Sequence, residues 1–262
     1  MSWSIARSTH RAARAGPRAR LPERWPSEIR LSPHIVDVVS CRLDLAPREC
    51  DALEALLSID ERNRAARLGT PAARRAFVAA RGRLRQLLGL LSNRPPEGLR
   101  LGLGVRGKPR LEGDPLPRLR FNVAHSGGLL VCAVTLDHEV GVDVERVREE
   151  VDCDRIARRF FAADEGQAFS ALPSSIRRQA FFACWTRKEA VVKATGEGLA
   201  RPLDSFAVSV DPVHAVLLAA DLSLGSPSDW SLLPIPLPSI YQGTVAIQRP
   251  RAALRPWLGR AA

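Results

Sequence analysis

Two carboxylates lie two residues apart in residues 139–145 of this 262-residue chain. Three valines alternate there with Gly141, Asp143 and Glu145. This period of two predicts a half-buried strand that carries both acids on one face. Asp is depleted in strands, and like charges side by side destabilise a sheet. We therefore expect a cation to lie between Asp143 and Glu145.

A third acid comes from a long helix predicted in the second half of the chain. Trp185, Glu189 and Lys193 follow one another at intervals of four residues, which places them on one helix face. As an exposed ion pair, Glu189 and Lys193 would contribute only about 0.3–0.5 kcal/mol. They lie beside a face rich in Phe and Trp, where unpaired charges are costly, so we favour a shared site.

Magnesium is the metal that these acids suit best. Asp143, Glu145 and Glu189 offer hard oxygen ligands, which favour Mg²⁺ over zinc. Such a metal commonly holds a substrate phosphate and neutralises charge that develops on a leaving phosphate. We therefore expect a Mg²⁺ site that carries a pyrophosphate.

Several basic residues are candidates for phosphate contacts. His125 lies in a turn rich in glycine, where backbone N–H groups can approach an anion, although a lone histidine is more often structural. Lys108, in a Gly-Lys-Pro turn, is either a rigidly presented cation or a solvated lysine. Arg67 and Arg75 could also bind phosphate, but the many arginines make this choice weak. Glu165 is most simply an exposed acid at a helix start.

The formal net charge of +11 favours an anionic partner. Residues 1–30 contribute +5, from seven arginines against Glu23 and Glu28, so the rest of the chain carries +6. Nucleic acid, a phosphorylated cofactor and an acidic protein would all satisfy this charge. A nucleic-acid-binding module would not explain three placed acids, and the single tyrosine offers little stacking on bases. We therefore expect no nucleic-acid partner.

Hydropathy and cysteine content bear on the compartment. No apolar run reaches the ~18–20 residues that a membrane span needs. Five widely spaced cysteines, without a Cys-x-x-Cys pair, argue against both a zinc site and a disulfide framework. We therefore expect a cytoplasmic protein that crosses no membrane.

The elements that must position these residues predict an α+β fold in two halves. We expect a flexible tail over 1–33, an N-terminal half over 34–136, a C-terminal half with the metal site over 137–250, and a tail over 251–262. In the first half, strands are predicted over 35–43, 99–105, 119–123 and 129–136, and helices over 47–59 and 71–91, with a basic connector over 60–70. In the second half, a strand over 139–145 and helices over 153–161, 163–172 and 176–195 precede strands over 205–210, 214–218, 230–233 and 243–248. Each half then has a small antiparallel sheet on a long helix, which suggests a duplication with pseudo-twofold symmetry.

Five motifs, spread in order over roughly residues 60–210, carry a family resemblance. They are Gly-Lys-Pro (107–109), Phe-Asn-x-x-His-Ser (121–126), Gly-Val-Asp-Val-Glu (141–145), Arg-Phe-Phe-x-x-x-Glu (159–165) and Trp-x-x-Lys-Glu-Ala-x-x-Lys (185–193). Together they resemble the 4′-phosphopantetheinyl transferases of the larger type, which activate peptide and polyketide synthases. The smaller type is much shorter and forms its site between subunits. The resemblance therefore implies a monomer that holds both halves in one chain.

The resemblance implies a particular reaction. Such enzymes bind coenzyme A and Mg²⁺ in a cleft between two similar halves. They transfer the phosphopantetheine arm to a serine of an apo carrier protein and release adenosine 3′,5′-bisphosphate. Carrier proteins of this family are typically acidic, which agrees with the basic balance of the chain. The carrier and the pathway, whether secondary-metabolite, siderophore or fatty-acid biosynthesis, stay open.

The resemblance also implies roles for individual residues. Asp143, Glu145 and Glu189 would bind Mg²⁺, and Glu189 would also help deprotonate the acceptor serine. Lys193 would contact the phosphate that is transferred. Further contacts to coenzyme A are implied for His125, Ser126, Lys108 and Lys188, and contacts to its 3′-phosphate for Arg67 and Arg75. Ala124 departs from the pattern, because the family usually has Ser before the His, and a hydroxyl contact to coenzyme A is lost there.

Overall fold

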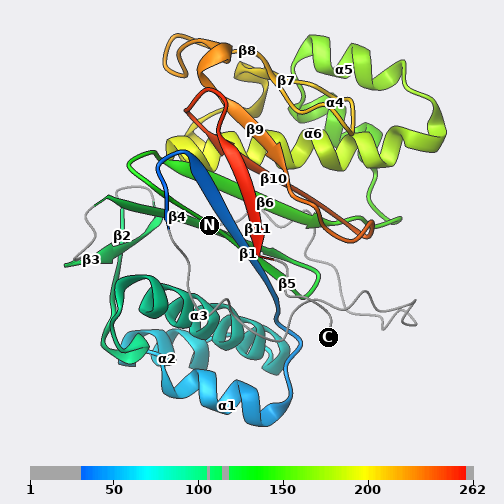
Figure 1. Ribbon diagram of the computed structural model, residues 1–262. Coiled ribbons are helices and arrows are strands. Elements are labelled where there is room, and N and C mark those ends of the chain that lie inside the picture. The colour runs from blue at the N-terminus through cyan, green and yellow to red at the C-terminus, as the bar shows by residue number, and fades with distance from the viewer. Residues whose placement is uncertain (1–30, 105–106, 114–117, 258–262) are drawn as a thin grey trace.

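Two sheets packed face to face form the centre of the structure, and helices cover their outer faces (Figure 1). The computed structural model describes residues 31–104, 107–113 and 118–257. Helices from the first half of the chain cover one outer face, and a long helix from the second half covers the other. The tail predicted over 1–33 lies, up to residue 30, outside the described residues.

The N-terminal half begins with a strand and three helices. Its elements are β1 (Ile35–Arg42), α1 (Pro47–Ala55), α2 (Ile59–Ala66), α3 (Pro71–Ser92), η1 (Pro96–Gly98), β2 (Arg100–Leu103), β3 (Pro109–Glu112), β4 (Leu119–Ser126) and β5 (Leu129–Leu136). Thr70 caps α3 through its hydroxyl, and Pro71 occupies the first turn. The expectation of a connector over 60–70 is wrong, because α2 lies there. A capping box between Ser58 and Glu61 starts this helix.

The N-terminal sheet is completed by the C-terminal end of the described chain. Strand β11 (Ala253–Trp257) pairs in parallel with β1, and the strand order is β11-β1-β5-β4. The fully buried Asp37 of β1 accepts hydrogen bonds from Arg255 Nε at 2.6 Å and from Trp257 Nε1 at 2.5 Å. The expected tail over 251–262 is therefore wrong for this strand. A parallel partner so distant in sequence leaves no local signal.

The C-terminal half carries the second sheet and the second long helix. Its elements are β6 (Val140–Arg146), α4 (Cys153–Phe160), α5 (Ala163–Ser170), α6 (Ser174–Thr195), η2 (Gly198–Ala200), η3 (Leu203–Ser205), β7 (Ala207–Val208), β8 (Leu217–Ala219), η4 (Pro227–Asp229), β9 (Ser231–Pro234) and β10 (Tyr241–Ile247). The strand order is β6-β10-β9, and β7 pairs separately with β8. Gly196, with φ of 69°, ends α6 in the left-handed conformation that glycine tolerates.

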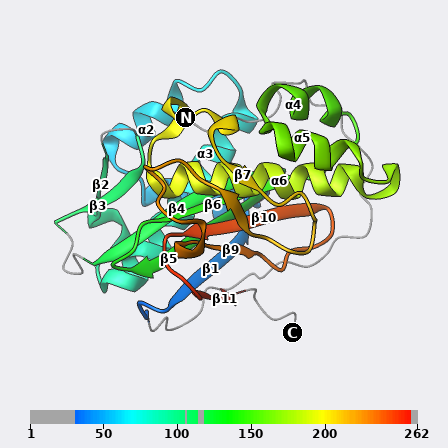
Figure 2. The same cartoon turned by 90° about the horizontal axis from the view of Figure 1, so that it is seen from above.

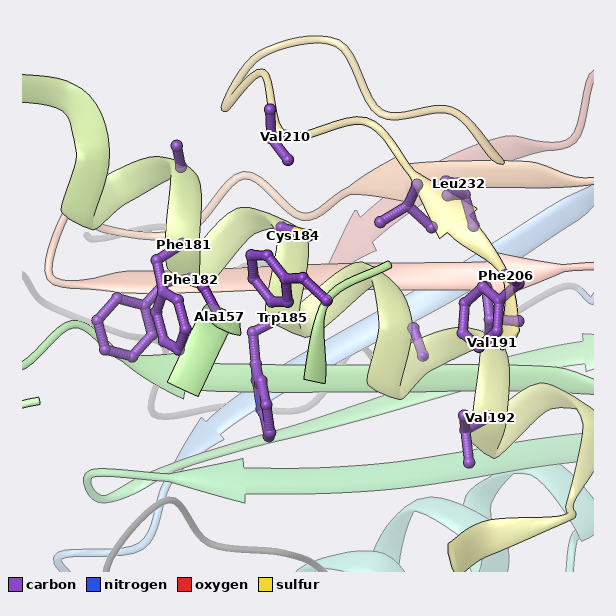
Figure 3. Packing of buried hydrophobic residues seen from close by; sticks show 14 of the residues in the cluster. Ala157, Phe181, Phe182, Cys184, Trp185, Val191, Val192, Phe206, Val210 and Leu232 are labelled. Carbon is purple, nitrogen blue, oxygen red and sulfur yellow. The ribbon is translucent and has the colours of Figure 1, made fainter. Parts of the chain in front are cut away.

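Helix α6 lies along β6 and β10 (Figure 2). Its Phe181, Phe182 and Trp185 belong to a buried cluster that includes Ala157 of α4 (Figure 3). The Trp185 ring stacks on Phe181, with centroids 6.0 Å apart, and meets the edge of Phe160 at 5.9 Å. This aromatic packing fixes the rotation of α6, and with it the direction in which its charged residues point.

The mixed α+β architecture is confirmed. Helices α3 and α6 both have 22 residues, and each belongs to a half with its own sheet. The pseudo-twofold relation and the other domain boundaries stay predictions. No helix in the described part of the chain is both long and apolar enough to span a membrane. All five cysteines are buried and free.

Candidate active site

Strand β6 presents its acids to helix α6, on the face that the alternation predicted. The valines of β6 are fully or almost fully buried against the N-terminal sheet. Gly141 faces the helix so closely that a Cβ there would lie 2.0 Å from Ala190 O and 2.3 Å from Ala194 N. Only glycine permits this approach. Strand and helix are thereby brought close enough for their charged side chains to meet.

Asp143 and Lys193 form an ion pair across this contact. Lys193 Nζ lies 2.6 Å from Asp143 Oδ1, and the Asp143 residue is 4% exposed. The other carboxylate oxygen, Oδ2, is buried without a hydrogen-bond partner among the described residues. Burial lowers the pKa of Lys193, but Asp143, Glu189 and Glu145 together raise it above its usual value. One ammonium thus faces three carboxylates.

The other two acids hold their protons unusually tightly. Burial, and then the charge of Asp143, raises the pKa of Glu145 to about 7. The same two causes raise the pKa of Glu189 to about 7, although Lys193 opposes them. Both shifts come first from burial and second from the negative charge of Asp143, and a bound cation would oppose both by favouring the ionised carboxylates.

The β4–β5 hairpin brings the N-terminal half to these acids. Ser126 Oγ donates to Glu145 Oε2 at 2.7 Å and accepts from Arg146 N at 3.1 Å. His125 lies near enough to Lys193 and Asp143 for their charges to act on its ring. Desolvation, and then the charge of Lys193, lowers the pKa of His125, which favours the neutral imidazole.

Lys108, Arg67 and Arg75 were also predicted to contact phosphate, and they lie on three different parts of the structure. Lys108 Nζ binds Glu139 Oε2 at 2.6 Å and Val140 O at 2.9 Å, at the start of the strand that carries the acids. Arg67 ends α2, where its Nε donates to the carbonyl of Asn63 at 3.2 Å. Arg75 is exposed in the first turns of α3. The assignment of both arginines to a phosphate stays a prediction.

Lys188 does not lie at the site, and its predicted contact with coenzyme A is wrong. Its side chain is fully buried, and Nζ binds both Glu165 oxygens at 2.6 Å and Phe206 O at 2.8 Å. These three contacts use all the donors of an ammonium. The expectation that Glu165 is exposed is wrong for the same reason, since it is 2% exposed and also accepts from the Ala162 and Val208 N–H groups.

A cavity of about 400 Å³ adjoins the acids. Glu189 and Lys193 line it together with Trp185. Its other lining residues are Arg159, Phe160, Val192, Gly198, Arg201, Pro202, Leu203 and Asp204. The Trp185 Nε1–H is buried without a partner among the described residues. The cavity therefore combines apolar side chains with charged ones, Glu189 and Lys193 among them.

Thr244 is a neighbour of the site that the sequence did not indicate. It stands opposite Asp143 in the β10–β6 pairing and is 2% exposed. Its hydroxyl lies 3.1 Å from the hydroxyl of Thr186 on α6. No local pattern could have found it, because three α-helices, three short 3₁₀ helices and three strands separate the two paired strands along the chain.

The acids do not form a finished metal cluster in this conformation. Within residues 31–104, 107–113 and 118–257, no group of three or more His, Cys, Asp or Glu side chains is arranged to hold a metal ion. The donor set nevertheless suits a hard cation. Asp143 Oδ2 is a buried oxygen without a partner in the described part of the chain, and added positive charge would favour the ionised form of the two glutamates beside it.

Comparison with known proteins gives consistent matches. Residues 139–246 match the 4′-phosphopantetheinyl transferase superfamily. The 4′-phosphopantetheinyl transferase HetI of Nostoc sp. is 37% identical over 193 residues, which span 73% of this chain and 78% of HetI. A 4′-phosphopantetheinyl transferase of Bacillus subtilis is 37% identical over 114 residues, 43% of this chain and 48% of that protein. The holo-[acyl-carrier-protein] synthase of Thermotoga maritima, at 21% identity, covers 43% of this chain and 64% of its own, but its TM-score of 0.34 is too low to carry an argument.

Proposed function

Because the chain belongs to the 4′-phosphopantetheinyl transferase superfamily and is of its larger type, we propose that it transfers the phosphopantetheine arm of coenzyme A to a serine of an apo carrier protein. Adenosine 3′,5′-bisphosphate is the other product. The observation that carries this proposal is the Asp143–Lys193 pair, with one buried carboxylate oxygen unused and two glutamates whose pKa is about 7 beside it.

A divalent metal fits the acids of β6 and α6. Asp143, Glu145 and Glu189 would hold it, with Asp143 Oδ2 as the oxygen that lacks any other partner among the described residues. When bound, Mg²⁺ would supply positive charge against the pyrophosphate of coenzyme A. In this structure the ammonium of Lys193 pairs with Asp143. With a metal bound to Asp143, Lys193 would be free to contact a substrate phosphate.

The proposed transfer needs a base for the serine hydroxyl, a cation beside the phosphate, and alignment of the serine oxygen with the phosphorus that it attacks. Nearby positive charge favours the carboxylate form of Glu189, which takes the proton of the carrier serine. The serine oxygen then forms a bond to the β-phosphorus of coenzyme A. The bond from that phosphorus to the bridging oxygen breaks, and its electrons leave with adenosine 3′,5′-bisphosphate. Lys193 stabilises the negative charge on the transferred phosphate.

The remaining contacts to coenzyme A divide between phosphates and arm. The neutral His125 can donate a hydrogen bond to a phosphate oxygen without adding charge. We assign Lys108, Arg67 and Arg75 to the phosphates as well. We assign the arm to the cavity lined by Trp185, Glu189 and Lys193, where its apolar part would pack against the indole ring.

The proposed carrier partner is acidic. Helix α4 presents Arg155, Arg158 and Arg159 to solvent, and Arg159 also lines the cavity. A negatively charged carrier that docks on this helix would deliver its serine beside Glu189. We further propose a cytoplasmic monomer, since one chain supplies all the acids and five unpaired cysteines suit a reducing compartment.

The test is a panel of apo carriers from acyl, peptidyl and aryl classes. Each is incubated with the protein, coenzyme A and Mg²⁺, and its mass is measured. We expect at least one carrier to gain the mass of the arm, and no carrier to gain it with EDTA. An unchanged mass for every carrier, with adenosine 3′,5′-bisphosphate never formed, contradicts the proposal.

A further inference from the structure

The junction between the two halves is made by side chains of β4 that bind the backbone of β6. Asn122 Oδ1 accepts from Val142 N at 2.9 Å, and Ser126 Oγ accepts from Arg146 N at 3.1 Å. These two anchors lie on either side of Asp143 along β6. The N-terminal half thus fixes the strand that carries the acids, although β4 and β6 belong to different sheets.

Ser126 also contacts one of the acids directly. Its hydroxyl oxygen already accepts from Arg146 N, so its proton is free for Glu145 Oε2 at 2.7 Å. A hydrogen bond to a buried carboxylate is stronger than one between neutral groups. It restrains the orientation of Glu145 and opposes the rise of its pKa.

The turn that carries Ser126 is itself held in place. Tyr241 Oη of β10 donates to Gly127 O at 2.6 Å, and Leu43 N donates to Gly128 O at 2.8 Å. A Cβ on Gly127 would lie 2.5 Å from the Arg146 side chain, so the turn rests on β6. The hydroxyl of Ser126 is therefore presented by a turn that is held by β6, by β10 and by the residue that follows β1.

We infer that Ser126 is a positioning residue that orients Glu145 for the metal, rather than a contact to coenzyme A. This inference rests on the proposed function. Partners that orient a metal ligand commonly change metal affinity by 10–100-fold when they are removed. The role of Ser126 lies in this hydrogen bond across the two halves, since its hydroxyl has both its proton and an acceptor position in use.

The chain contains a close control for this serine. Ser231 Oγ donates to Arg249 O at 2.7 Å and accepts from Ala252 N at 3.1 Å, the same two distances as for Ser126. Ser231 is half-buried, like Ser126, but none of its contacts reaches Asp143 or Glu145. The variant Ser231→Ala thus removes an equivalent pair of hydrogen bonds outside the site.

The experiment measures Mn²⁺ binding to the full-length protein, without coenzyme A or carrier, by electron paramagnetic resonance. We expect Ser126→Ala to weaken Mn²⁺ binding about 10-fold, Ser126→Thr to restore most of it, and Ser231→Ala to leave it unchanged. Coenzyme A affinity should be the same in all four proteins. If Ser126→Ala unfolds, Ser126→Cys, similar in size but a weak donor, replaces it.

Three results overturn the inference, and they can be told apart. Wild-type Mn²⁺ affinity in Ser126→Ala, when Asp143→Asn has lost binding, refutes the role of Ser126 and leaves the metal site intact. If the affinity for coenzyme A falls in Ser126→Ala, Ser126 contacts the substrate instead. Mn²⁺ binding that Asp143→Asn does not change refutes the proposed metal site, and the inference with it.

Discussion

Lys193 Nζ lies 2.6 Å from Asp143 Oδ1, which joins the long helix of the C-terminal half to the strand that borders the N-terminal half. The other oxygen of Asp143 has no partner within the described residues. The ammonium therefore neutralises only part of the negative charge that three carboxylates gather here. This incomplete balance is the physical basis for a cation site.

Asp143→Asn should nearly abolish transfer while the protein stays folded. The amide keeps the shape of the side chain but removes the charge that faces Lys193 and the proposed metal. We expect the rate to fall on the order of 100–1,000-fold, the cost of losing one group that stabilises developing charge. Carrier mass measured over time, with circular dichroism as the check on folding, tests this. A variant with nearly normal rate would contradict the assignment.

The metal-free protein should lose stability as pH rises from about 5 to 8. The pKa of Glu145 and of Glu189 is raised from 4.5 to about 7, so the folded state binds these protons more tightly than the unfolded state. Their contribution is therefore present below pH 4.5 and is lost as pH rises through 7. The loss is at most about 3 kcal/mol for each group, and thermal melts in EDTA measure it.

The matched control for this pH dependence is an exposed acid. Glu189→Gln should flatten the decline in melting temperature between pH 5 and 8, because its amide does not titrate. Glu150→Gln, on the exposed segment after β6, should leave the decline unchanged. Mg²⁺ should raise the melting temperature more at pH 8 than at pH 5. A melting temperature that rises with pH in EDTA would show the opposite linkage.

Local pattern predicted the parts of the site that lie on one strand and one helix. The alternation around Asp143 gave the correct face of β6, and the four-residue spacing of Glu189 and Lys193 gave the correct face of α6. Helix α2 was also predictable, because Ser58 and Glu61 have capping-box spacing, but its arginines suggested a connector.

Contacts between distant segments could not be read from the sequence. Lys188 stands next to Glu189 in the sequence. Because a helix turns about 100° per residue, the two side chains leave α6 in different directions, and Lys188 points into the buried core. Its partner Glu165 lies on another helix, and the third contact is a backbone carbonyl at Phe206. The pairing of β11 with β1 is equally non-local. The position of Lys188 beside Glu189 in the sequence motif therefore led to a wrong prediction that Lys188 lies at the site.

Gly141→Ala should damage both stability and transfer. Its methyl group would lie 2.0 Å from Ala190 O and 2.3 Å from Ala194 N, which are backbone atoms that cannot move aside singly. Helix α6 must shift, and Lys193 shifts with it away from Asp143. Overpacking costs typically about 1–3 kcal/mol, and we expect the upper end. Urea unfolding and the transfer assay measure the two effects.

Gly166→Ala is the control for that substitution. Gly166 lies within α5, and a Cβ there meets nothing within 4 Å. Alanine at this position should stabilise the protein by roughly 0.5–1 kcal/mol through helix propensity, without a change in transfer. Equal effects of the two substitutions would show that the close approach at Gly141 does not govern the site.

Lys188→Met should destabilise the protein without weakening its affinity for coenzyme A. The substitution leaves Glu165 buried and short of its countercharge, which typically costs about 3–5 kcal/mol. The backbone N–H groups of Ala162 and Val208 still donate to that carboxylate, so the lower part of this range is expected. Urea unfolding gives the stability, and calorimetry below the unfolding range gives the affinity of the folded protein. Normal stability together with weak coenzyme A binding would return Lys188 to the phosphates, where the motif first placed it.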